Sequence, residues 1–90
     1  MPDQPRGFQI KLPDDKAGGV YANNMIVAHS REEFVMDFIY VFPHQGVVNA
    51  RVITSPGHMK RIVRALTENL RKYEAQYGDV REATEPPVVN

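Results

Sequence analysis

Residues 33–42 read EFVMDFIYVF, a run that holds three of the four phenylalanines of the chain among β-branched side chains. Such side chains suit a pleated, half-buried surface, so the run is typical of a β-strand. Residues 20–30 precede it, and a tight turn at Arg31-Glu32 that pairs Ser30 with Glu33 makes the two runs an antiparallel hairpin. One face then carries Tyr21, Asn23, Met25, Val27 and His29 with Phe34, Met36, Phe38, Tyr40 and Phe42. We expect this aromatic face to form the core.

The opposite face of the hairpin is smaller and of mixed polarity. It carries Ala22, Asn24, Ile26 and Ala28 with Val35, Asp37, Ile39 and Val41. Residues 47–54 follow a turn at 43–46 and return as a further strand. An even register places Val48, Ala50 and Val52 with the aromatic residues, and Asn49, Arg51 and Ile53 beside Asp37. This register predicts an ion pair between Asp37 and Arg51.

Alternation of apolar and polar side chains over residues 8–12, ended by Pro13, predicts a short first strand, and residues 13–19 read as a loop. The predicted fold class is therefore α+β. It consists of a four-stranded antiparallel sheet, with its strands in the chain order β-β-β-β, followed by one long C-terminal helix on one face.

The helix is bounded by clear signals. Ser55-Pro56 reads as an N-cap followed by proline in the first turn, and Gly78 reads as the stop. Between them apolar residues recur every three or four positions: Met59, Ile62, Val63, Leu66, Leu70, Tyr73 and Tyr77. A helix of this length spans about 33 Å. We expect it to cover the aromatic face and to bury together Phe34, Met36, Phe38, Val52, Ile62, Leu66 and Leu70.

Length and composition limit the remaining possibilities. A chain of ninety residues forms one small domain. Its eleven basic and eleven acidic side chains cancel, so no net electrostatic field attracts a charged partner. The absence of cysteine excludes disulfides and thiolate metal sites. We expect an ordered domain over residues 8–80 between disordered tails at 1–7 and 81–90. No secretory leader or membrane-spanning run is visible, so the expected compartment is the cytoplasm and no membrane partner is expected.

Catalytic motifs are absent from the sequence. His29, His44 and His58 stand singly, without the spacing of metal ligands, and the carboxylate pairs Asp14-Asp15 and Glu32-Glu33 fall in turns where nothing desolvates them. We therefore expect neither enzymatic activity, nor a cofactor, nor a metal.

Basic residues gather in the helix, where they form a candidate site for an anion or a nucleic acid. The residues are His58, Lys60, Arg61, Arg64 and Arg71. Cations in the first turns oppose the helix dipole, a cost that binding of an anion would offset. An ordinary solvated helix face explains the same residues, and the sequence leaves both interpretations open.

Two resemblances bear on identity. Residues 33–38 (EFVMDF) and 55–61 (SPGHMKR), continued by Ala65-Leu66, Asn69-Leu70, Tyr73-Glu74 and Tyr77-Gly78, resemble a family of small bacterial proteins catalogued as domain of unknown function 3467. The resemblance covers residues 20–80 and implies no catalytic residues. Four antiparallel strands followed by a long helix are also similar in architecture to SecB-like export chaperones, whose subunits assemble through their sheets.

The expected function is a non-enzymatic binding or adaptor domain that self-associates as a homodimer or larger homo-oligomer, with chaperone-like capture of a protein client as one version. The smaller sheet face has no second helix to cover it and is the candidate oligomer surface. Its residues are Ile26, Val35, Asp37, Ile39, Val41, Arg51 and Ile53. The alternative is a nucleic-acid or phosphoanion-binding protein that uses the basic side of the helix.

Overall fold

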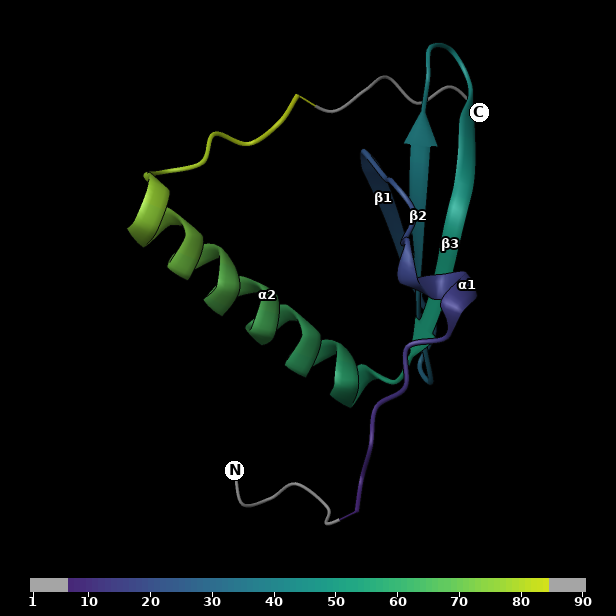
Figure 1. Cartoon of the computed structure of the whole chain (residues 1–90). Helices are drawn as coiled ribbons and strands as arrows, with labels where there is room; N and C mark the ends of the chain where they lie inside the picture. The colour runs from purple at the N-terminus through teal and green to yellow at the C-terminus, as the bar shows by residue number, and fades with distance from the viewer. Residues whose placement is uncertain (1–6, 85–90) are drawn as a thin grey trace.

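The computed structural model describes residues 7–84. The elements are a one-turn helix α1 (Asp14–Ala17), three strands β1 (Asn24–His29), β2 (Phe34–Val41) and β3 (Gly46–Thr54), and a long helix α2 (Pro56–Tyr77). The strands form one antiparallel sheet in the order β1-β2-β3 (Figure 1). The α+β class and the C-terminal helix are confirmed. Most of the two predicted tails, 1–7 and 81–90, lies outside the described residues.

The predicted first strand does not form, so the sheet of the described residues has three strands rather than four. Residues 8–12 pair with neither edge of the sheet, and Phe8, Ile10 and Leu12 are exposed. Alternation alone cannot hold a strand, because the backbone groups need a partner strand for their hydrogen bonds. The predicted loop that follows contains α1, where the amide of Lys16 donates to the carbonyl of Pro13 at 2.9 Å.

The hairpin of β1 and β2 has the predicted register. The amide of Ser30 donates to the carbonyl of Glu33 at 2.9 Å, and His29 lies opposite Phe34. The Ser30 hydroxyl also accepts from the amides of Glu32 and Glu33, which closes the turn. The aromatic face therefore exists as a continuous surface on one side of this hairpin.

The register between β2 and β3 is confirmed for the half of the ladder next to α2, where Met36 pairs with Val52 and Phe38 with Ala50. Beyond Phe38 a β-bulge shifts it, so Ile39 pairs with Val48. The prediction that Val48 joins the aromatic face is wrong for this reason. A bulge inserts one extra residue in one strand and moves all later residues to the other face.

Helix α2 has the predicted bounds. Its N-cap Ser55 is extended, and the Ser55 hydroxyl accepts from the amide of His58 at 3.3 Å. Gly78 ends the helix with φ 98°, a conformation that disfavours side chains with a Cβ atom.

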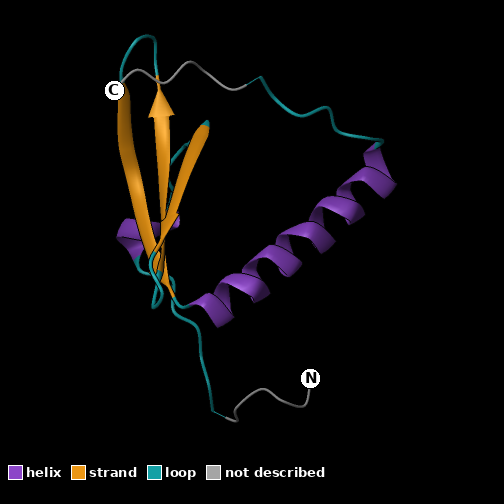
Figure 2. Ribbon diagram, turned by 180° about the vertical axis from the view of Figure 1, so that it is seen from behind, coloured by secondary structure: helices purple, strands orange, loops and turns teal. Residues whose placement is uncertain are grey.

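The predicted shared core between helix and sheet is wrong. Among the described residues only Met36 and Ile39 are buried, at 7% and 8% exposure, whereas Leu66 and Leu70 are 65% and 51% exposed. Figures 1 and 2 show the reason: α2 diverges from the sheet along its length. Only Ser55 separates β3 from α2, whereas connections between strands and helices usually have two to six residues.

Candidate interaction surfaces

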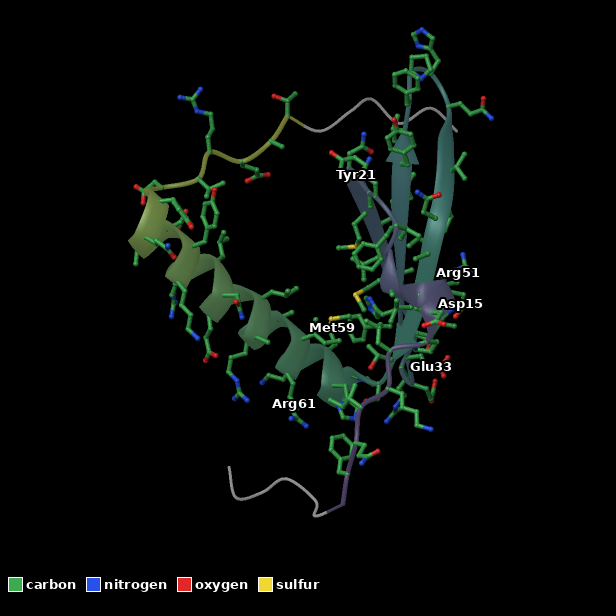
Figure 3. All side chains as sticks on the ribbon, viewed as in Figure 1. Asp15, Tyr21, Glu33, Arg51, Met59 and Arg61 are labelled. Atoms are coloured by element: carbon green, nitrogen blue, oxygen red, sulfur yellow. The ribbon has the colours of Figure 1, made fainter. Side chains whose placement is uncertain are left out.

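The aromatic face looks toward α2. Figure 3 shows Met59 on the side of α2 that faces the sheet and Arg61 on the side that points away. It also shows Arg51 and Asp15 on the far side of the sheet from α2. Because Arg51 belongs to the same face as Asp37, the opposite, aromatic face is the one turned toward α2 (Figure 3).

The apolar residues of α2 form a helix stripe along the side that carries Met59 and faces the sheet (Figure 3). The stripe consists of Met59, Ile62, Val63, Leu66, Leu70, Tyr73 and Tyr77. Met59 and Ile62, nearest the sheet, are half-buried, and the remaining five are at least half exposed. The rings of Tyr73 and Tyr77 lie 4.9 Å apart. Four turns of helix thus present an apolar side that nothing in the described chain covers.

The aromatic face is only partly covered as well. Met36 is buried and Phe34 and Phe38 are half-buried, but Met25, Val27, Tyr40 and Val52 are exposed. Its aromatic residues pack against one another: Tyr21 meets Tyr40 edge to face at 5.7 Å between centroids, and Tyr40 stacks on Phe42 at 6.0 Å. His29 lies 5.3 Å from Phe34. The face is a formed surface that lacks a covering layer.

The smaller face contains the predicted ion pair. Arg51 Nε donates to Asp37 Oδ1 at 2.7 Å and Arg51 Nη2 donates to Oδ2 at 2.9 Å. This hydrogen-bonded guanidinium lowers the pKa of Asp37, although partial burial of the carboxylate opposes the shift, and the same contact raises the pKa of Arg51.

The remaining residues of the predicted oligomer surface differ in exposure. Ile26 and Ile53 are exposed, Val35 and Val41 are half-buried, and Ile39 is buried. Ile39 therefore belongs to the interior of the single chain. A Cβ atom at Gly46 would approach Ile39 Cγ2 to 3.3 Å, which shows how closely the backbone covers this side chain.

The structure brings together three of the five candidate anion-binding residues. A hollow beside the start of α2 is lined by Thr54, His58, Arg61, Ile62, Arg64, Ala65 and Glu68. At about 100° per residue, Lys60 and Arg71 lie on the flank of α2 away from this hollow. Within residues 7–84 the one ion pair is Asp37 with Arg51, so no carboxylate of this part of the chain lies within 4.0 Å of the basic groups of α2. The Glu68 carboxylate in the hollow nevertheless repels an anion.

The other polar residues singled out by sequence are scattered. His29 lies beside Phe34, His44 lies in the turn between β2 and β3, and His58 begins α2. Within residues 7–84 no three His, Asp or Glu side chains form a group able to hold a metal ion. In the same part of the chain, neither helix has both the length and the apolar character required to cross a membrane.

Sequence reasoning missed two asparagines that fix the sheet. The Asn23 side chain accepts from the amide of Val41 at 2.9 Å and donates to its carbonyl at 3.0 Å, as a strand backbone would. Asn49 Nδ2 donates to the carbonyl of Tyr21 at 2.7 Å, which ties the segment before β1 to β3. Asparagine is rare in strands, so its presence inside a strand pattern was the available signal.

The comparisons with known proteins identify a family and no activity. A family model described as "Protein of unknown function (DUF3467)" matches residues 1–82. No curated protein and no solved structure matches the chain. The architectural similarity to SecB-like chaperones depended on four strands, and the described sheet has three. A match over nearly the whole chain shows that it belongs to the DUF3467 family of proteins of unknown function.

Proposed function

We propose that this chain is a non-catalytic, self-associating binding domain. The observation that carries the proposal is the exposure of two apolar surfaces, the helix stripe and the aromatic face. Large exposed apolar patches are uncommon on small soluble proteins and mark interaction sites.

The amount of exposed surface supports an obligatory partner. The chain of 10.2 kDa exposes 8445 Å², whereas a folded monomer of this mass exposes about 5,300 Å². Granting residues 1–6 and 85–90 the surface of an unfolded chain still leaves an excess of about 1,700 Å². A standard interface buries about 800 Å² per partner.

Sedimentation of the full chain at micromolar concentration tests the proposal. We expect a dimer or larger assembly for the wild type, and a shift to monomer for Leu66→Asp, because a carboxylate in an apolar contact loses its hydration without a partner. Arg64→Asp, on the outer side of the same helix, is the matched control and should leave the assembly intact. A wild-type chain that sediments as a monomer would refute self-association.

The two narrower functions have less support. Capture of an unfolded client would use the same apolar surface, but nothing distinguishes a client from a second copy except the self-complementarity described below. Binding of a phosphoanion or nucleic acid rests on the basic outer side of α2 alone, and Glu68 in the hollow weakens it. We therefore place self-association first.

A further inference from the structure

The connection between β3 and α2 keeps the helix from closing on its own sheet. Thr54 ends β3 and Pro56 begins α2, so the direction of the helix is set by Ser55, with φ −79° and ψ 159°. This conformation is held at both ends of the residue: the Ser55 hydroxyl accepts from His58 N, and its carbonyl accepts from Met59 N at 2.9 Å. Swinging α2 inward would require a change in the backbone of Thr54 or Ser55, because the connection has no spare residues.

The helix stripe and the aromatic face match each other in size and chemistry. The stripe runs along a helix of 22 residues, about 33 Å, and β2 has eight residues, about 27 Å. The stripe residues carry no charge, and the cations of α2 lie off the stripe, as Figure 3 shows for Arg61, which points away from the sheet. Contact between the two surfaces would therefore bury no unpaired charge.

We infer that two copies exchange their C-terminal helices, so that the α2 stripe of each copy covers the aromatic face of the other. This inference rests on the self-association proposed above and specifies its geometry. With a two-fold axis, the helix stripe of each copy contacts the aromatic face of the other copy, so both surfaces of both copies are covered at once. The excess exposed surface is enough for such an interface. A short, constrained hinge is the usual condition for exchange of an element between identical copies.

Cysteine cross-linking tests the exchange, since the chain contains no cysteine of its own. Leu66→Cys on the stripe and Val27→Cys on the aromatic face are both exposed in the single copy. After the two single variants are mixed and allowed to re-equilibrate, a short bis-maleimide should join them as a covalent heterodimer. Leu70→Cys with Met25→Cys is a second pair in case the first disturbs folding.

Two matched mixtures serve as controls. Arg64→Cys with Val27→Cys moves the helix cysteine to the outer side, and Leu66→Cys with Ile53→Cys moves the sheet cysteine to the other face. Each should give several-fold less covalent heterodimer than the test pair. Equal yields in all three mixtures would contradict the exchange.

A dilution experiment separates exchange from closure within one copy. A chain that carries both Leu66→Cys and Val27→Cys is mixed with a tenfold excess of cysteine-free wild type. Under exchange, the link between the two cysteines drops several-fold, because most double-cysteine copies then have a wild-type partner. A link that persists within one chain overturns the exchange. If the wild type sediments as a dimer but neither pair cross-links, exchange is wrong and self-association stands; a monomer refutes both.

Discussion

At the scale of residues, the clearest local interaction is the ion pair between Asp37 and Arg51. Both oxygens of Asp37 accept from the guanidinium, at 2.7 and 2.9 Å, across the β2–β3 ladder. The Asp37 side chain is 17% exposed and that of Arg51 61% exposed, so solvent screens the pair from one side. We therefore expect the contribution of this pair to the free energy of unfolding to vary with the ionisation of Asp37.

The pH dependence of that contribution has a definite sign. The hydrogen bond from Arg51 lowers the pKa of Asp37 below its ordinary value of 3.8, so the folded chain takes up this proton less readily than the unfolded chain. The carboxylate then stabilises the fold above pH 3.8, and this stabilisation disappears as the pH falls through the lower folded value. In urea unfolding followed across this range, Asp37→Asn should lose less stability on acidification than the wild type. Arg51→Gln should flatten the profile in the same way, and a wild-type profile in both variants would contradict the assignment.

At the scale of elements, α2 has both of its ends specified by single residues. Ser55 and Pro56 start it and Gly78 ends it, yet none of its side chains is buried. Helix propensity and capping thus account for where the helix begins and ends, whereas its apolar stripe remains largely uncovered within the described chain.

Lengthening the hinge tests whether the connection causes the helix to stand away from the sheet. Insertion of a few Gly and Ser residues between Thr54 and Ser55 leaves the cap on α2 intact and frees the helix to swing inward. We expect the assembly to shift toward a monomer in which the stripe covers its own aromatic face. Sedimentation measures the shift. A control insertion of the same length in the turn at 43–46 should leave the assembly unchanged, and a hinge variant that stays dimeric would show that the connection is not the constraint.

At the scale of the whole molecule, the single copy lacks an adequate core. Met36 and Ile39 are the only buried residues in the described part of the chain, and they lie on opposite faces of a three-stranded sheet. A sheet of this size needs a packed layer on its apolar face for independent stability. We therefore expect the chain to fold and to assemble in a single coupled process.

This coupling predicts a concentration-dependent melting temperature. When only the assembly is folded, mass action raises Tm as the protomer concentration rises. Calorimetry or circular dichroism over a hundredfold range of concentration should show a steady increase for the wild type and for Arg64→Asp. Leu66→Asp should melt at lower temperature, or fail to fold, at every concentration in that range. A wild-type Tm that is independent of concentration would show that a single copy is stable alone.

The sequence by itself determined the elements whose causes are local. Alternation in residues 33–42 and the turn at Ser30 fixed the register of β1 against β2, and Ser55, Pro56 and Gly78 fixed the bounds of α2. The pair Asp37–Arg51 followed from that register. Each depends on residues close in the chain or directly opposite in a ladder, where side-chain period and backbone geometry leave few choices.

The tertiary structure alone decided how these elements meet. Residues 8–12 alternate like a strand but find no partner edge, and the bulge after Phe38 moves Val48 to the other face. Ile39, predicted on the candidate oligomer surface, is buried within the single chain. The apolar stripe of α2 predicted a contact with another apolar surface but did not identify that surface. An apolar pattern indicates that a side chain must be covered, but which surface covers it depends on the length and direction of the connection between elements. Here α2 begins one residue after β3 and runs away from its own sheet (Figure 1).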